Sequence, residues 1–215
     1  GGSISFRPPM LFALGVISMF LLGGLSGIMH ASVPVDTQQQ DTYFVVAHLH
    51  YVLFGGSIFA LMAGAYYWFP KVTGRIMNER TGKLHFWLTF IGFNLTFFPQ
   101  FVLGYLGMPR RYHVYPEEFQ ILNVMSTAGA SILAAGYLIL FAYLFLSLFI
   151  GRKAGPNPWR AVGLEWEITS PPGPHNFDVT PIVTKEAYAY EEEDVTRVGD
   201  GTSAEGDPIP QEAER

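Results

Sequence analysis

The chain has 215 residues, of which 49% are hydrophobic and only 14% are charged, and its formal net charge is −5. This acidic balance argues against nucleic-acid binding, which depends on a basic surface facing the phosphates. The absence of cysteine excludes a disulfide framework, iron–sulfur ligation and zinc sites built from thiolates. The sequence starts at Gly1 without a methionine, so we expect a polypeptide that was cut, processed or split from a longer one.

Four apolar stretches fill residues 1–150. A helix needs about 20 consecutive apolar residues to cross a bilayer, and four segments meet this length: Pro8–Met29, Tyr43–Phe69, Leu84–Met108 and Leu122–Ile150. Short polar segments that contain proline or glycine separate them. The sequence therefore predicts an all-α membrane protein with four transmembrane helices surrounded by membrane lipid.

Basic residues near the span ends predict the orientation, because cytoplasmic loops carry an excess of lysine and arginine. Arg7, the loop 70–83 and the segment after Ile150 hold most of the basic residues near the spans, and all three lie on one side if there are four spans. Both termini are therefore expected on the cytoplasmic or mitochondrial matrix side. Arg110 and Arg111 then fall on the outer side, against this trend. They are either ordinary juxtamembrane charges or the partners of a fixed anion.

Residues 151–215 differ from the spans in composition. They hold 13 of the 18 acidic residues and show neither a helical nor a strand period. Prolines interrupt them repeatedly, and Glu191–Asp194 is a charge run typical of a solvated segment. We expect an extended segment on the cytoplasmic side over residues 151–190 and a disordered acidic tail over residues 191–215.

The second span contains two histidines, His48 and His50. Ionisable residues inside a bilayer are costly, and they indicate function by default. On an α-helix, residues i and i+2 differ by about 200° in direction, so the two rings should point to nearly opposite faces. They are poorly placed to chelate one ion, but they could bind two metal centres that flank the helix. Glycines on the first two spans leave room either for bulky planar cofactors or for close helix packing. A hydrogen-bonded structural role is the alternative for a lone histidine of this kind.

Carboxylates precede the second span on the side where Arg110 and Arg111 are expected. Asp36 and Asp41 lie in the loop, and Asp41 lies about two turns, or roughly 10 Å, before His48. These carboxylates could hold a hard cation such as Mg²⁺ or pair with the two arginines. Asp41 could also cap the helix, which is a common role for aspartate at a helix start.

Several runs of this sequence resemble heme–copper terminal oxidase subunit I. The runs that carry the resemblance are Asp41–Val52, Phe97–Gln100, Gly107–Tyr112, Leu164–Glu167, Ser170–Pro172 and His175–Phe177. The first of them resembles the tenth transmembrane helix of that family, and the last three look like the segment after its final core helix. The resemblance covers about residues 1–190 and implies that the four spans are helices nine to twelve of a twelve-helix core.

The resemblance implies a role for each histidine of the second span. His48 would be the axial ligand of the high-spin heme at the oxygen-reducing site. His50 would be one of the two axial ligands of the low-spin heme. Both groups would be heme A, and a copper centre with ligands outside this chain would complete the oxygen-reducing site.

The resemblance also implies roles for polar residues at the outer end of the spans. Arg110 and Arg111 would bind heme propionates, and Asp36 would lie near a propionate of the high-spin heme. Asp41 would be a ligand of a non-redox Mg²⁺. Gln40 stands where the family often has histidine, and its amide oxygen would offer a further ligand to that ion.

The sequence departs from the family pattern in some places. Leu49 stands between the two histidines where the family usually has phenylalanine, so an aromatic ring between the hemes is missing. The other four histidines lie at span edges or outside the spans. They offer neither copper ligands nor the second ligand of the low-spin heme, so the rest of subunit I must come from another polypeptide or another part of this one.

The resemblance implies the C-terminal third of the catalytic subunit of a respiratory terminal oxidase, in a bacterial cytoplasmic membrane or the mitochondrial inner membrane. Such an enzyme reduces O₂ to water with electrons from cytochrome c and pumps protons. The implied partners are the remaining part of subunit I, subunits II and III, and cytochrome c. Within the superfamily, the alternatives are a quinol oxidase and a nitric-oxide reductase. Outside it, they are a non-catalytic diheme or scaffold subunit and a transporter bundle with a histidine proton relay.

Overall fold

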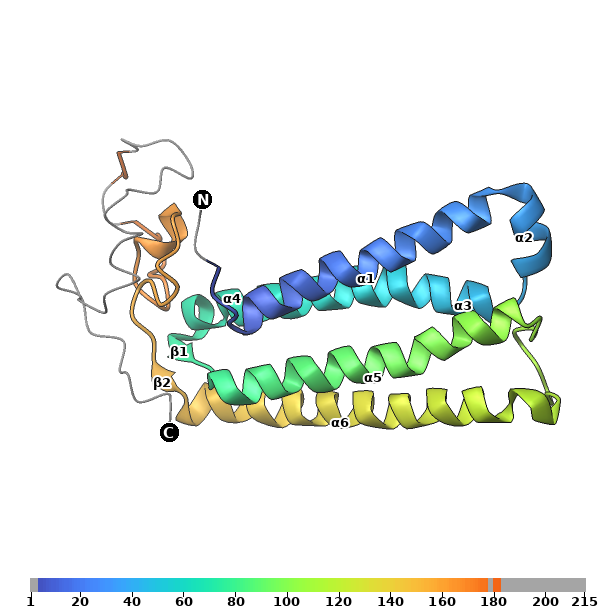
Figure 1. The fold of residues 1–215 in the computed structure, drawn as a ribbon. Coiled ribbons are helices and arrows are strands. Elements are labelled where there is room, and N and C mark those ends of the chain that lie inside the picture. Colours follow the sequence, from blue (N-terminus) through green and yellow to red (C-terminus); the bar gives the residue numbers. More distant parts are fainter. Residues whose placement is uncertain (1–3, 178–179, 183–215) are drawn as a thin grey trace. The chain divides into compact units, whose positions relative to one another are not determined.

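Four long helices dominate the computed structural model, which describes residues 4–177 and 180–182. The helices long and apolar enough to cross a membrane are Pro8–Ala31, Tyr43–Thr73, Glu79–Tyr105 and Glu117–Ile150. Figure 1 shows them running alongside one another. Each predicted span lies largely within one of these helices, so the prediction of an all-α membrane fold with four spans is confirmed.

The second span is built from several consecutive helical segments, and a short helix precedes it. In chain order the helices are α1 (Pro8–Ala31), α2 (Val33–Gln39), α3 (Tyr43–His50), the π-helix η1 (Tyr51–Ile58), α4 (Phe59–Thr73), α5 (Glu79–Tyr105), the 3₁₀-helix η2 (Glu117–Phe119) and α6 (Gln120–Ile150). Most of them belong to one compact unit formed by residues 6–68 and 77–151.

Local sequence explains where the helices begin. Two prolines open α1 in its first turn, where a missing N–H leaves no helical hydrogen bond unmade. Thr42 caps α3, because its hydroxyl oxygen accepts a hydrogen bond from the backbone N–H of Phe44 at 3.2 Å. Asn78 caps α5 in the same way, accepting from the N–H of Thr81 at 3.2 Å.

The second span and its approach differ from the prediction in three respects. The helix continues through Pro70 and ends at Thr73, because a proline in the last turn removes only one hydrogen bond and its fixed φ suits a helix. The middle of the span, η1, has π rather than α geometry. The polar segment before the span, for which the sequence predicted no helix, contains the short helix α2.

Glycines allow α5 and α6 to approach backbone to backbone. A Cβ atom at Gly92 would lie 2.6 Å from the backbone nitrogen of Leu133, and a Cβ at Gly129 would collide with the backbone nitrogen of Thr96. At this close approach the hydroxyl of Ser126 donates to the carbonyl oxygen of Thr96 at 2.7 Å. The third and fourth spans therefore form a tight pair.

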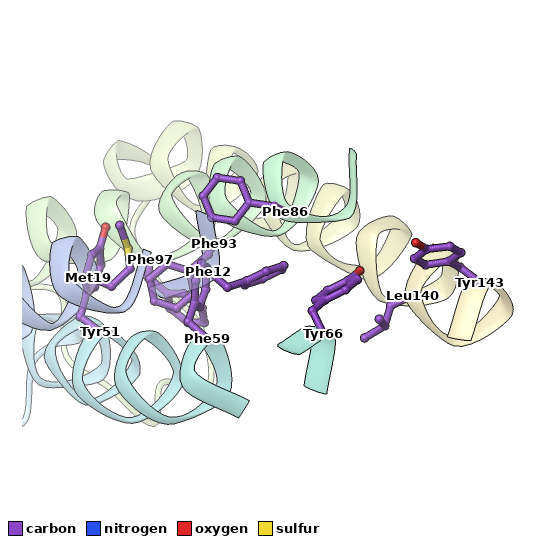
Figure 2. Packing of buried hydrophobic residues seen from close by; sticks show 10 residues of the cluster. All are labelled: Phe12, Met19, Tyr51, Phe59, Tyr66, Phe86, Phe93, Phe97, Leu140 and Tyr143. Atoms are coloured by element: carbon purple, nitrogen blue, oxygen red, sulfur yellow. The ribbon is translucent and has the colours of Figure 1, made fainter. Parts of the chain in front are cut away.

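Aromatic side chains fill the space between the helices (Figure 2). Phe12 of α1 stacks on Tyr66 of α4 with 5.6 Å between ring centroids, and it meets Phe86 of α5 edge-on at 5.1 Å. The Tyr51 hydroxyl donates to Asn94 of α5 at 2.8 Å. Such aromatic pairs each stabilise the fold by about 0.5–1.5 kcal/mol beyond their buried area. The core thereby fixes the position of the second span between α1 and α5.

A second compact unit contains, among the described residues, 4–5, 69–76, 152–177 and 180–182. Its regular elements besides the end of α4 are the antiparallel strands β1 (Arg75–Ile76) and β2 (Arg152–Lys153) and the 3₁₀-helix η3 (Leu164–Trp166). Lys71 is buried here, and its ammonium group donates to the carbonyl oxygens of Pro156 and Ile168 at 2.9 and 2.7 Å. Lys71 thus ties the segment after β2 to the end of α4. The disordered tail predicted for residues 191–215 lies outside the described residues, and the division at residue 190 stays a prediction.

Candidate functional site

His48 lies on α3 and faces α1. Its Nδ1 is 3.0 Å from the carbonyl oxygen of Gly23 and 2.9 Å from the hydroxyl oxygen of Ser26. The Ser26 hydroxyl itself donates to the Gly23 carbonyl at 2.9 Å, so its oxygen is available to accept. Since a carbonyl oxygen can only accept, these contacts assign the proton of the neutral ring to Nδ1 and leave a lone pair on Nε2. A histidine that binds a metal is held in this way, with its second ring nitrogen donating to a carbonyl group.

Glycine at position 27 of α1 leaves space beside the His48 ring. A Cβ atom built on Gly27 would lie 3.0 Å from His48 Cε1 and 3.7 Å from Nε2. An ordinary van der Waals contact begins at 3.4 Å, so even a methyl group there would press on the ring. The room at Gly27 therefore lies next to the nitrogen that carries the lone pair.

His50 follows the same pattern on another side of α3. Its Nδ1 is 2.8 Å from the carbonyl oxygen of Val46, one turn earlier in the helix. Its ring lies nearly parallel to that of Phe97 on α5, with 4.1 Å between centroids and 14° between planes. The contact with a carbonyl again places the proton on Nδ1 and leaves the Nε2 lone pair available.

The two histidines contact different neighbouring helices. His48 bonds to α1, whereas His50 packs on α5. This arrangement agrees with the prediction from helix geometry that residues two apart point to nearly opposite faces. Each ring can thus serve one centre, and neither helps the other to chelate a common ion.

A third histidine lies beside His48. The ring of His30, near the end of α1, has its centroid 5.1 Å from that of His48 and 5.2 Å from that of Phe44. Its Nδ1 is 3.2 Å from Oδ1 of Asp36 in the first turn of α2. Its Nε2 is buried and has no hydrogen-bond partner among the residues that the structure describes. The sequence shows only that His30 lies at a span edge. Its contact with Asp36 depends on the turn between α1 and α2, which leaves no recognisable signal in the sequence.

Asp41 and Arg110 form a direct ion pair. The Arg110 Nε atom donates to Asp41 Oδ1 at 2.7 Å, and the Arg110 backbone N–H donates to the Asp41 carbonyl oxygen at 2.9 Å. Thr42 and Pro109 form an isolated antiparallel bridge beside this pair. The cap of α3 is Thr42, so the alternative that Asp41 caps the helix is wrong. The anion that faces Arg110 is therefore the Asp41 carboxylate of this chain. Pairing of a loop carboxylate with the arginines was one of the predicted alternatives.

Arg111 and Gln40 are both exposed at this end of the bundle. Arg111 has a φ of 60°, in the left-handed region, so the chain turns sharply directly after Arg110. The amide that is buried here belongs to Gln39, which is 3% exposed and whose Oε1 has no hydrogen-bond partner within the described part of the chain. The sequence did not single out Gln39, because three consecutive glutamines carry no signal that distinguishes one from another.

The described residues do not assemble a multi-ligand metal site. Within residues 4–177 and 180–182, no three or more histidine, aspartate or glutamate side chains gather so that they could hold a metal ion. A copper or magnesium site at this location would need ligands from outside this set. His48 and His50 could each offer one nitrogen to a separate centre, because they contact different neighbouring helices.

Comparison with known proteins gives a family. A family model described as "Cytochrome C and Quinol oxidase polypeptide I" matches residues 1–132. Over 190 residues the chain is 57% identical to the cytochrome c oxidase subunit 1 of Synechocystis sp. and 51% identical to that of Thermostichus vulcanus. Each match covers 88% of this chain and 34% of the relative. The chain thus spans about a third of the length of these curated relatives.

A solved structure shares the fold. A heme–copper terminal oxidase dimer determined by cryo-EM matches with a TM-score of 0.61 and 22% sequence identity. The match covers 67% of this chain and 27% of that one.

Proposed function

The chain belongs to the cytochrome c and quinol oxidase polypeptide I family, and from this we propose that it is the C-terminal part of the catalytic subunit of a respiratory terminal oxidase. The complete enzyme would transfer electrons from cytochrome c to O₂, form water and pump protons. Cytochrome c is the proposed donor because the curated relatives are named cytochrome c oxidase. The remaining part of subunit I would supply the copper ligands, and subunits II and III would complete the complex in a bacterial cytoplasmic or mitochondrial inner membrane.

The observation that carries this proposal is the state of the two histidines on α3. Both donate from Nδ1 to a backbone carbonyl and keep a lone pair on Nε2, and they do so toward different neighbouring helices. A neutral imidazole with its Nε2 lone pair available would suit heme iron, which takes histidine as a protein ligand. His48 would hold the iron of the high-spin heme and His50 that of the low-spin heme. A transporter that relays protons through histidines has no need for two rings locked in the same tautomer.

When bound, heme A supplies the redox-active iron, and the residues of this chain set where that iron lies. The Gly23 carbonyl and the Ser26 hydroxyl hold the His48 ring at one angle, which strengthens it as a donor. Phe97 stacks on His50 and keeps the second ring from turning. α3 would thereby hold both proposed heme ligands on one helix and fix the spacing between them.

Polar groups at the outer end are proposed to hold the charged edge of the cofactors. Arg110 and Arg111 would bind heme propionates, and Asp36 would lie near a propionate of the high-spin heme. Asp41 would contribute to an Mg²⁺ site, with Gln40 as a further oxygen ligand. Arg110 occupies only Oδ1 of Asp41, so the second carboxylate oxygen remains available for a cation.

Optical spectroscopy of the complete complex tests the ligand assignment. His50→Ala should abolish the low-spin bis-imidazole spectrum and leave a high-spin signal. His48→Ala should abolish oxygen reduction, because the high-spin iron loses its protein ligand. His113→Ala is the matched control, since this histidine is exposed in an outer loop, and its spectra and turnover should equal those of the parent.

Two results would contradict the proposal. Unchanged low-spin absorbance in His50→Ala would remove His50 as a ligand, and unchanged oxygen reduction in His48→Ala would remove His48. The donor is tested separately with the purified complex, which should oxidise reduced cytochrome c. Oxidation of quinol instead would favour a quinol oxidase, which the family description also includes.

A further inference from the structure

Three buried polar atoms of α5 and α6 have no hydrogen-bond partner among the residues that the structure describes. They are Nε2 of His85 and the hydroxyl oxygen of Thr89, both on α5, and the hydroxyl oxygen of Tyr137 on α6. One buried polar atom without a partner is already costly. Three of them on facing helices indicate a partner that they share.

The three side chains lie close together. His85 and Thr89 are one turn apart on α5 and therefore share a face of that helix. The His85 ring is edge-on to the Tyr137 ring, with 6.2 Å between centroids. Thr89 Oγ1 lies against α6 next to Tyr137, since a Cβ atom built on Gly136 would be 3.2 Å from it. A small molecule about 3 Å from each polar atom could therefore bridge all three.

Thr89 differs from other hydroxyl residues of the same two helices. Thr96, Thr127 and Ser131 each donate to the carbonyl oxygen one turn earlier, at 2.6, 3.0 and 3.0 Å. Thr89 is fully buried, yet its hydroxyl bonds to no atom of the described part of the chain. Its hydroxyl is therefore available to a ligand between the helices.

The surroundings admit only a small ligand without charge. His85 and Thr89 are both 0% exposed, and Phe12 of α1 packs on the His85 ring with 5.1 Å between centroids. A side chain from another polypeptide therefore does not reach these atoms. An imidazole and two hydroxyls also supply no carboxylate oxygen, which Mg²⁺ and Ca²⁺ prefer as a ligand.

The ligand must be able both to donate and to accept hydrogen bonds. Nδ1 of His85 is 2.9 Å from the hydroxyl oxygen of Tyr66, and a tyrosine hydroxyl can play either role. Nε2 of His85 is accordingly an acceptor or a donor. The other two atoms belong to hydroxyl groups, which also do both. Water meets this requirement at every contact.

We propose that one buried water molecule binds between α5 and α6, with His85 Nε2, Thr89 Oγ1 and the Tyr137 hydroxyl as its partners. Three hydrogen bonds are typical of a buried water molecule. The water links α5 to α6, and the bond between His85 and Tyr66 extends this link to α4. The site is formed by this chain alone, so it is independent of the proposed heme ligands.

Removing one hydroxyl at a time tests the water by the sign of the effect. With the water bound, Thr89→Val and Tyr137→Phe each remove one of its partners, and each should speed thermal unfolding of the purified complex about tenfold. Without a water, the same changes replace an unsatisfied polar atom by an apolar one and should slow unfolding. Thr96→Val is the matched control on the same helix. Its buried hydroxyl already bonds to the Gly92 carbonyl, and a bond of this kind adds little to helix stability, so the unfolding rate should hardly change.

A double variant tests whether one molecule serves both hydroxyls. Thr89→Val combined with Tyr137→Phe should cost less than the two single effects together, because the second change acts on a water that has already lost a partner. Thr96→Val combined with Tyr137→Phe should be additive. Slower or unchanged unfolding in both single variants, or additive effects of Thr89→Val and Tyr137→Phe, would overturn the proposal.

Cryo-EM of the parent complex, at a resolution that shows ordered water, is the second measurement and needs no variant. We expect density for one water molecule about 2.7–3.2 Å from all three atoms. Direct hydrogen bonds among the three side chains, or a map without this density, would overturn the proposal even if the variants failed to assemble.

Discussion

The space that Gly27 leaves beside His48 leads to a sharp test of the proposed iron ligand. Replacing Gly27 by alanine puts a Cβ atom 3.0 Å from His48 Cε1, whereas an ordinary contact begins at 3.4 Å. The ring must therefore give way by about 0.4 Å. It cannot do so freely, because Nδ1 is held by Gly23 and Ser26 at 3.0 and 2.9 Å.

The size of the effect follows from the cost of crowding a packed site. Overpacking of this kind costs about 1–3 kcal/mol, which corresponds to a change of about 5- to 150-fold in an equilibrium constant. The strain falls on the His48 ring, so we expect a weaker iron–imidazole bond and partial loss of the high-spin heme. The low-spin heme should be spared, because His50 contacts α5 and not α1.

A matched control lies one turn away on the same helix. A Cβ atom on Gly24 would meet no other atom within 4 Å, so Gly24→Ala adds the same methyl group to open space. Both variants gain the same helix propensity, about 1 kcal/mol at an interior position. The difference between them therefore isolates the contact with His48.

The assay is performed on the purified complex. The iron–histidine stretching mode in resonance Raman spectra and the carbon monoxide difference spectrum of the reduced enzyme both report on the high-spin centre. Gly27→Ala should lower the stretching frequency and the fraction of heme that binds carbon monoxide, and Gly24→Ala should match the parent. If Gly27→Ala also matches the parent in both measurements, the proposal that His48 binds the iron is refuted.

Three further predictions concern packing and charge. Gly129→Val should lower the thermal stability of the complex, because the new side chain collides with the backbone of α5. Ala130→Val is the control, since Ala130 is exposed, and equal melting temperatures of the two variants would refute the prediction. Lys71→Met should make the segment after α6 more sensitive to limited proteolysis, because Lys71 donates two short hydrogen bonds to it and bonds to charged groups contribute about 1.5–3 kcal/mol each. Lys153→Met is the control, since Lys153 is exposed. Equal cleavage rates would contradict it. Arg111→Met should lower a heme midpoint potential by removing a positive charge near a propionate, and Arg111→Lys should restore it only in part, because an ammonium group lacks the planar fork; potentials equal to the parent in both variants would leave this residue an ordinary juxtamembrane charge.

The apolar spans were predictable because a bilayer demands long uninterrupted runs of nonpolar residues, and composition alone reveals such runs. The opposite directions of His48 and His50 also followed from helix geometry. The continuation of α4 through Pro70 was not predictable, because whether a proline ends a helix depends on the contacts that the residues of the next turn make. Lys71, in the same last turn of α4, donates to two backbone carbonyls of the segment after β2, a contact that the sequence does not reveal.

The loop contacts were the hardest part of the candidate site to predict. The sequence offered several partners for Asp41, and only the bridge between Thr42 and Pro109 brings Arg110 to it. The contact of His30 with Asp36 depends on α2, a seven-residue helix that is too short for its hydrophobic period to be recognised. Side chains that turns bring together leave no periodic pattern in the sequence, so the structure is needed to identify such pairs.

The π-helix η1 changes the angular relation between the two parts of the second span that it joins, α3 and α4. In an α-helix each residue advances the side-chain direction by about 100°. In a regular α-helix the directions of His48 and His50 would therefore determine which residues after residue 58 face the core. A stretch of wider turns absorbs an angular offset. Winding the same residues as a regular α-helix would rotate Phe59 and Tyr66 by about 100° away from Phe12, whereas deleting one residue from η1 would restore α winding without that rotation. The π geometry of η1 therefore lets the histidines on α3 and the aromatic residues on α4 face their own neighbours along one continuous span, which regular α winding of the same residues would not allow.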